Sequence, residues 1–169
     1  METIRKATVD DAETLATISR QTFDAAFGTQ YAADDLAAFV ETNYAAEQAR
    51  RELADPEIGV WLLEEGGRAL GYVLAGPCKL DNPDVTPDCR EIHRLYLLPD
   101  FQGGGRGARL MEAAMAWLER DRPRRIWLGV FSGNTAAQRF YERLGFGKVG
   151  EHTFKVGRTV DREFTYRRG

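Results

Sequence analysis

Four glycines in five positions, Gly103, Gly104, Gly105 and Gly107, mark the stretch of this chain best suited to bind a ligand. An apolar segment, residues 95–98, precedes them, and a run of helix-forming residues follows. Glycine has no Cβ, so a ligand can approach the main chain closely at these positions. Amides at the start of a helix attract anions, because the helix dipole is positive at that end. The pattern therefore predicts a cradle for a phosphate or pyrophosphate group of a cofactor.

One possible frame of these glycines is the dinucleotide-binding pattern G-x-G-x-x-A, which Gly103, Gly105 and Ala108 satisfy. A single match of this kind is weak evidence. The pattern should lie in the first strand–turn–helix unit of a parallel domain, followed by a strand that ends in an acidic residue. Here the glycines begin only at position 103, and residues 130–133 at the end of the next apolar strand include no carboxylate. A P-loop is also disfavoured, because no Gly-Lys-Ser/Thr follows.

The second frame is Gln102-x-x-Gly105-x-Gly107, which resembles the acetyl-CoA-binding signature of the GNAT superfamily of N-acetyltransferases. Residues 134–146 then resemble the family's second motif, N-x-x-A-x-x-x-Y-x-x-x-G-F. The resemblance implies an acetyl-CoA cosubstrate, no metal, and acetyl transfer to a primary amine by direct attack. A non-catalytic acyl-CoA-binding module is the alternative from another functional class.

The resemblance implies that one strand and the loop after it bind acetyl-CoA. The strand would offer its main chain to the pantetheine arm, and the loop amides would bind the pyrophosphate. Arg106 could contact a phosphate or face solvent, and Gly104 stands where the family often has Lys or Arg. The predicted cofactor-binding residues are Leu95, Tyr96, Leu97, Gln102, Gly103, Gly104, Gly105, Arg106, Gly107, Ala108 and Asn134.

Two side chains of the second motif suit the chemistry at the thioester. Asn134 and Tyr141 lie seven residues apart, which places them on one face of a helix, about 10 Å apart. By resemblance Tyr141 is the general acid that protonates the leaving thiolate, and Asn134 contacts the cofactor arm. The alternatives are a helix N-cap for Asn134 and a half-buried packing role for Tyr141. A main-chain N–H near Leu97 is the expected oxyanion donor.

The base that deprotonates the amine has two candidates, Glu91 and His93, on the strand before the glycines. They share a face of the strand if the side chains alternate. Some family members carry a catalytic glutamate at a position like that of Glu91, which makes it the first choice. His93 is the second choice, because an unperturbed imidazole has a pKa of about 6.5. The alternatives are two ordinary polar residues or a chain of water molecules.

The acceptor is predicted less sharply than the cofactor. Thr22-Phe23 with Phe27, residues 126–130, and Gly150 with His152 and Phe154 resemble the bacterial spermidine/spermine N-acetyltransferases, so a polyamine is the leading candidate. A small amine, an amino-acid derivative, an antibiotic, and a protein N-terminus or lysine stay open. Candidate carboxylates for a cationic acceptor are Asp24, Asp34, Asp35, Asp81, Asp84 and Asp88.

The elements that must position these residues alternate between strands and helices. Predicted strands cover residues 3–7, 58–63, 68–75, 91–97, 125–131, 146–149 and 162–166. Predicted helices cover residues 34–41, 45–54, 107–121 and 134–144, after a helix that starts near residue 8. We expect a mixed α+β single domain over residues 1–169. By resemblance it has a mostly antiparallel twisted sheet of about six to seven strands, helices on both faces and two splayed central strands. Residues 9–54 would border the substrate, and residues 89–150 would bind acetyl-CoA.

Composition limits the remaining classes. The chain has 169 residues, 43% of them hydrophobic and 29% charged, with a net charge of -3, which disfavours a nucleic-acid-binding protein. No secretory signal and no apolar run of about 18 residues is present, so a cytoplasmic protein without membrane contact is expected. Two cysteines and two histidines lack zinc-site spacing. A homodimer through the C-terminal strands or a helix face is compatible with the sequence.

Overall fold

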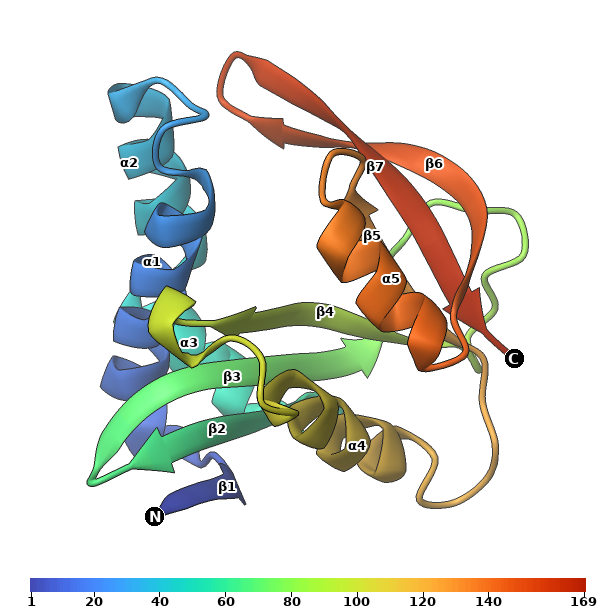
Figure 1. The fold of residues 1–169 in the computed structure, drawn as a ribbon, viewed down its shortest axis with the longest axis horizontal. Helices are drawn as coiled ribbons and strands as arrows, with labels where there is room; N and C mark the ends of the chain where they lie inside the picture. The colour runs from blue at the N-terminus through green and yellow to red at the C-terminus, as the bar shows by residue number, and fades with distance from the viewer.

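The computed structural model describes residues 1–169, and one seven-stranded sheet runs through it in the order β1-β2-β3-β4-β5-β7-β6 (Figure 1). All neighbouring strands are antiparallel except β4 and β5, which are parallel. The strands are β1 (Glu2–Lys6), β2 (Gly59–Glu65), β3 (Arg68–Pro77), β4 (Arg90–Leu97), β5 (Ile126–Phe131), β6 (Gly147–Val156) and β7 (Thr159–Arg168). The predicted mixed α+β fold with a mostly antiparallel sheet is confirmed.

Helices cover both faces of this sheet, as predicted. The helices are α1 (Ala12–Phe27), α2 (Ala33–Asn43), α3 (Ala46–Ala54), α4 (Arg106–Leu118) and α5 (Thr135–Arg143), with short 3-10 turns η1 (Val9–Asp11) and η2 (Pro99–Phe101). In Figure 1, α1, α2 and α3 lie behind and to the left of the central strands, whereas α4 crosses in front of them. No helix is long and apolar enough to cross a membrane.

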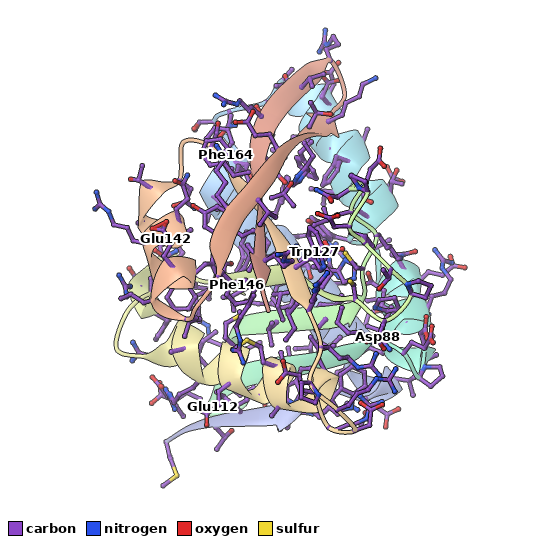
Figure 2. The ribbon with its side chains drawn as sticks, turned by 90° about the vertical axis from the view of Figure 1, so that its right-hand side faces the viewer. Asp88, Glu112, Trp127, Glu142, Phe146 and Phe164 are labelled. Atoms are coloured by element: carbon purple, nitrogen blue, oxygen red, sulfur yellow. The ribbon has the colours of Figure 1, made fainter.

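Alternation along β2 and β3 divides the core into two layers. Leu62 and Tyr72 belong to the cluster formed with α1 and α3, whereas Leu63 and Val73 belong to the cluster formed with α4. Successive side chains of a strand point to opposite faces, so both faces of these strands are apolar. Figure 2 shows Glu112 of α4 on the outside of the molecule, on the face of α4 away from the sheet.

The two central strands separate after a short contact. β4 and β5 pair only at Arg90 with Ile126 and Glu91 with Trp127, and then they diverge (Figure 1). The register between β3 and β4 also shifts here, because Leu74 pairs with Arg94 while Ala75 pairs with Ile92. His93 is therefore the extra residue of a β-bulge, which bends β4 away from its neighbour. The predicted splay of two central strands is present.

The C-terminal hairpin is longer than the predicted segments 146–149 and 162–166. β6 and β7 each have ten residues, and they pair from Gly147 with Arg167 to Val156 with Thr159. Charged side chains on this arm, such as Glu151 and Arg162, obscure the apolar alternation that marks a strand. Helix α4 in turn ends at Leu118, three residues before the predicted end.

This hairpin reaches from the sheet to the N-terminal helices (Figure 1). Its residue Val156 packs in an aromatic cluster with Phe23, Tyr31 and Tyr44 from the N-terminal part of the chain. The Tyr31 hydroxyl donates a hydrogen bond to Asp161. The space between α2 and the hairpin is thereby closed on one side.

Candidate active site

The glycine loop adopts a conformation that suits its predicted role. Gly103, Gly104 and Gly105 have φ values of 85°, 64° and 78°, which L side chains rarely adopt. Gly105 is the N-cap of α4, so this loop leads directly to the amides at the helix start. A Cβ at Gly107 would lie 3.3 Å from Phe140, which shows how closely α4 approaches α5. The loop can present main-chain N–H groups to an anion without any side-chain charge.

A cleft of about 1010 Å³ lies between the splayed strands, and we call it the cofactor cleft. It is continuous with the glycine loop and the start of α5. Ten of the eleven predicted cofactor-binding residues line it, namely Leu95, Tyr96, Leu97, Gln102, Gly103, Gly104, Gly105, Gly107, Ala108 and Asn134. An open strand edge, a glycine cradle and a helix start fit an extended molecule with a pyrophosphate at one end.

Arg106 is the predicted cofactor residue that does not line the cleft. Its guanidinium forms an ion pair with Glu2 at 2.7 Å, and Arg109 binds the same carboxylate at 2.9 Å. The predicted phosphate contact of this side chain stays a prediction, and the structure shows it engaged by Glu2. Arg106 ties β1 to α4, because Glu2 supplies the anion nearest to it.

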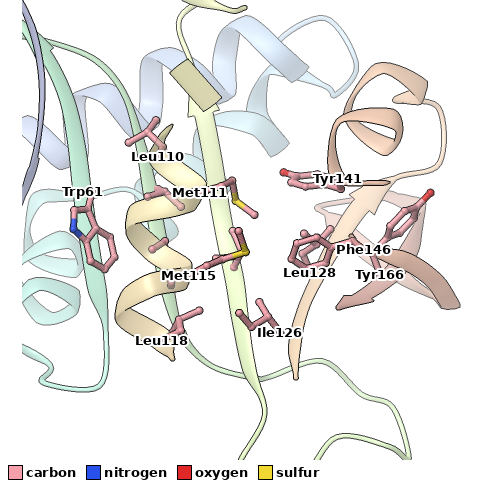
Figure 3. Packing of buried hydrophobic residues seen from close by; sticks show 14 of the residues in the cluster. Trp61, Leu110, Met111, Met115, Leu118, Ile126, Leu128, Tyr141, Phe146 and Tyr166 are labelled. Carbon is pink, nitrogen blue, oxygen red and sulfur yellow. The ribbon is translucent and has the colours of Figure 1, made fainter. Parts of the chain in front are cut away.

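Asn134 and Tyr141 both face the cofactor cleft from α5. The Asn134 side-chain oxygen accepts a hydrogen bond from the Ala137 N–H at 3.0 Å, so the N-cap role is real. Tyr141 is buried beside Phe146, and its hydroxyl has no hydrogen-bond partner in the protein. Figure 3 shows this hydroxyl pointing across the gap toward β4. Burial raises the pKa of Tyr141, which keeps the hydroxyl protonated.

A second cavity of about 420 Å³ adjoins the cleft, and we call it the acceptor cavity. Helices α1, α2 and α3, the loop after β3, and the β6–β7 hairpin all contribute to its lining. Six residues line both spaces, namely Phe27, His93, Arg94, Tyr96, Gly129 and Glu163. The two cavities therefore share one wall, at the point where β4 and β5 diverge.

The two predicted base candidates are brought together beside this wall, where His93 belongs to the wall and Glu91 lines the acceptor cavity alone. Glu91 Oε2 lies 3.4 Å from His93 Nδ1, and Glu91 Oε1 accepts the Lys79 main-chain N–H at 2.9 Å. His93 Nε2 lies 2.8 Å from the Pro77 carbonyl oxygen, which can only accept a hydrogen bond. Nε2 therefore carries a proton, and Nδ1 of the neutral ring faces the Glu91 carboxyl group.

Burial changes the proton affinities of this pair in opposite directions. It raises the pKa of Glu91 to about 7, against a smaller lowering by the Lys79 N–H. It lowers the pKa of His93 to about 4, well below the value of an unperturbed imidazole. A base must hold a proton well enough to remove it from the amine. Glu91 meets this requirement better than His93 does.

Three polar residues of the shared wall or its neighbourhood were not predicted from the sequence. Arg94 donates through Nη2 to both carboxylate oxygens of Glu52, at 2.9 and 3.0 Å. Glu163 accepts a hydrogen bond from His152 at 2.9 Å. Glu163 lies in β7, whose many charged residues gave no reason to single it out. The one available signal was Gly129, because a glycine within a strand of bulky apolar residues indicates that other side chains pack against that position.

The predicted aspartates do not line the acceptor cavity. Asp34 and Asp35 bind Arg158, and Asp88 binds Arg122 and Arg124. Arginine side chains therefore already engage these three aspartates. The carboxylates in the cavity are instead Glu52, Glu91 and Glu163.

Comparison with known sequences identifies relatives of similar length. The Acetyltransferase (GNAT) family profile matches residues 20–146. An uncharacterised N-acetyltransferase of Mycobacterium bovis is 35% identical over 147 residues, which is 87% of this chain and 90% of the relative. Another uncharacterised N-acetyltransferase, from Lactobacillus delbrueckii subsp. lactis, is 33% identical over 140 residues, with 83% and 81% coverage.

Solved structures share the fold over nearly the whole chain. The PaiA N-acetyltransferase of Thermoplasma acidophilum, solved in complex with coenzyme A, has a TM-score of 0.80 at 19% identity and covers 99% of this chain and 98% of its own. The ribosomal-protein-S18-alanine N-acetyltransferase of Escherichia coli has a TM-score of 0.71 at 17% identity, with 99% and 93% coverage. With the family profile, the close relatives, the splayed strands and the glycine loop all in agreement, this chain belongs to the GNAT family of acetyltransferases.

Proposed function

We propose that this protein transfers the acetyl group of acetyl-CoA to a primary amine by direct attack, with the amine bound in the acceptor cavity. The observation that carries the proposal is the wall shared by the two cavities at the divergence of β4 and β5. A cofactor arm along β4 and an amine in the acceptor cavity would meet at this wall.

The cofactor would be held mainly by main chain. Amides of the glycine loop and of the start of α4 would bind the pyrophosphate, and β4 would line the pantetheine arm through Leu95 and Leu97. Acetyl-CoA supplies an activated thioester when it is bound. An N–H of β4 near Leu97 is the proposed donor to the carbonyl oxygen, since β4 lacks a strand partner along this edge.

Two side chains would move protons. Tyr141 would donate its hydroxyl proton to the leaving thiolate, which its raised pKa and its unpartnered hydroxyl support. Glu91 would take the proton of the ammonium, directly or through water, with a pKa of about 7. His93 would not act as the base itself, because its own pKa of about 4 makes it the weaker base of the two.

A polyamine remains the first acceptor to test. Phe27, His152 and Phe154, which are among the residues that resemble those of spermidine/spermine N-acetyltransferases, line the acceptor cavity. The cavity also holds the cation Arg94 beside its carboxylates, so a small amine, an amino-acid derivative, an antibiotic and a protein N-terminus or lysine stay as alternatives.

The test is an acetylation assay with acetyl-CoA and a panel of amines, with thiol release and product mass as readouts. The panel should contain spermidine, spermine, monoamines, amino-acid amides and short peptides with a free N-terminus or a lysine. We expect thiol release that depends on one amine class and a product heavier by one acetyl group. Tight binding of acetyl-CoA without transfer to any amine would instead support the non-catalytic acyl-CoA-binding alternative.

A further inference from the structure

Gly129, in the middle of β5, has no side chain, and side chains of β6 and β7 occupy the space beside it. A Cβ on Gly129 would lie 2.8 Å from the His152 ring and 2.9 Å from Glu163 Oε1. Such distances are shorter than real Cβ atoms show, so no other residue fits here without displacing this pair. Gly129 borders both cavities, beyond the last residue pair between β4 and β5.

The filling pair is fixed by hydrogen bonds. His152 Nε2 lies 2.9 Å from Glu163 Oε1, and His152 Nδ1 lies 2.7 Å from the Thr165 hydroxyl oxygen. An ionised carboxylate only accepts, so Nε2 donates to Glu163, and Nδ1 forms the hydrogen bond with the Thr165 hydroxyl. Oε2 of Glu163 has no hydrogen-bond partner in the protein. One carboxylate oxygen is therefore free while the other holds the group in place.

Glu163 differs from the other two carboxylates of the acceptor cavity. Glu52 uses both of its oxygens on Arg94, and Glu91 has the Lys79 N–H and His93 as neighbours. Glu52 and Glu91 line the acceptor cavity alone, whereas Glu163 lines the cofactor cleft as well. Only Glu163 combines a free oxygen with a place in the shared wall.

From this arrangement we propose that Glu163, positioned by His152 and Thr165, is the site that binds the ammonium group of the acceptor beside the thioester. The proposal deepens the proposed function and rests on it. The free Oε2 accepts a hydrogen bond from the ammonium, which is a charge-assisted contact. The carbon chain of the acceptor then lies along Phe27, Phe154 and Tyr96, which line the same cavity. The ligand class is a primary ammonium on an extended carbon chain.

The first test measures binding without turnover. The chain has two histidines, so side-chain ¹⁵N resonances of labelled protein report on His93 and His152 separately, once a His93→Gln variant assigns them. Spermidine, and each amine that the acetylation assay selects, is titrated into protein saturated with CoA. We expect the His152 resonances to move with saturation, because its partner Glu163 receives the ammonium.

The second test uses matched variants of the full chain. Glu163→Gln keeps an acceptor for His152 but removes the charge, so we expect the Kd and KM of the amine to rise about tenfold or more. Gly129→Ala displaces the pair without removing it and should weaken amine binding in the same direction. Glu151→Gln, an exposed residue of the same hairpin that binds Arg162, is the control and should change amine binding less than twofold. Circular dichroism and thermal unfolding of all three show that they fold. Because Glu163 and Gly129 also line the cofactor cleft, the Kd of acetyl-CoA is measured as well and should rise much less than the Kd of the amine.

The outcomes separate this proposal from the proposed function. Unchanged amine binding in Glu163→Gln, or resonance shifts confined to His93, would overturn the ammonium site while acetyl transfer persists. If no amine of the panel binds the CoA-loaded protein or is acetylated, both proposals fail together. A rise in the Kd of acetyl-CoA equal to that of the amine would show a structural role and would also overturn the ammonium site.

Discussion

The ring of Tyr141 is packed in the core, but its hydroxyl group forms no hydrogen bond within the protein. The ring contacts Phe140 and Phe146, and both contacts involve its faces or edges instead of its oxygen. A phenylalanine at this position would keep the packing and lose only the proton donor. A Tyr141→Phe substitution therefore tests the proposed catalytic role of the hydroxyl without disturbing the packing of the ring.

We predict that Tyr141→Phe lowers kcat about 100-fold, because a positioned general acid contributes roughly 10²–10⁴-fold. The Kd of acetyl-CoA and the midpoint of thermal unfolding should change little. Thiol release under saturating substrates and calorimetric titration with acetyl-CoA give the two readouts. A rate equal to that of the wild type would remove Tyr141 from the mechanism without affecting the family assignment.

Glu91 should make the stability of the fold depend on pH. Its folded pKa of about 7 lies above the ordinary value of 4.5, because burial disfavours the charged form. The folded state then binds this proton more tightly than the unfolded chain does. The free energy of unfolding therefore falls as the pH rises from about 4.5 to about 7, by about 3 kcal/mol from this group.

In Glu91→Gln this contribution should be absent, because the amide does not titrate yet still accepts the Lys79 N–H. Urea unfolding of both proteins at pH 5 and pH 8 measures the difference. The variant should gain stability relative to the wild type at pH 8, and less so at pH 5. A difference that does not depend on pH would mean that Glu91 titrates normally.

At the scale of elements, the turn between β4 and α4 depends on glycine for a specific reason. Gly105 has a φ of 78°, as does Gly67 in the turn between β2 and β3. At both positions an added Cβ would meet nothing within 4 Å. An alanine would thus cost about 1 kcal/mol of backbone strain at either place, without a steric clash.

We predict that Gly105→Ala raises the Kd of acetyl-CoA about tenfold, because the residue lines the cofactor cleft and caps α4. Gly67→Ala carries the same strain away from the cleft, so it should lose similar stability and keep the wild-type Kd. Calorimetry with acetyl-CoA and thermal unfolding of both variants test this pair. If both variants raised the Kd of acetyl-CoA equally, backbone strain alone would explain the effect, and the glycine loop would have no specific role in binding.

At the scale of the whole molecule, the acceptor cavity depends on contact between distant parts of the chain. Asp161 of the hairpin accepts hydrogen bonds from Tyr31 and from Gln30, the latter at 3.2 Å. Asp35 of α2 binds Arg158 at 3.0 Å. These contacts hold the β6–β7 hairpin over the N-terminal helices.

We predict that Asp161→Asn weakens this closure by about 1–2 kcal/mol, since hydrogen bonds to a charged group are the stronger kind. Amide hydrogen exchange should then accelerate about tenfold in the outer part of β6 and β7. The KM of the amine should rise, while the Kd of acetyl-CoA stays constant because the cofactor cleft does not include Asp161. Unchanged exchange in the hairpin would show that the aromatic cluster alone holds it.

The sequence by itself predicted most of the residues that line the cofactor cleft. The glycine loop, the N-cap Asn134 and the position of Tyr141 follow from the conformations of a few neighbouring residues, which local sequence specifies. The strands and helices around them were predicted with small errors at their ends. Arg106 was the exception, because its partner Glu2 lies at the far end of the chain.

Only the tertiary structure showed which residues line the acceptor cavity. The acceptor cavity combines residues from α1 to β7, so no local pattern shows which carboxylates meet there. Asp34 and Asp88 proved to have partners of their own, and Glu163 faces the cleft because Gly129 leaves room for it. The proton affinities of Glu91 and His93 likewise depend on burial, which arises only when the strands, the loop and the hairpin assemble around them.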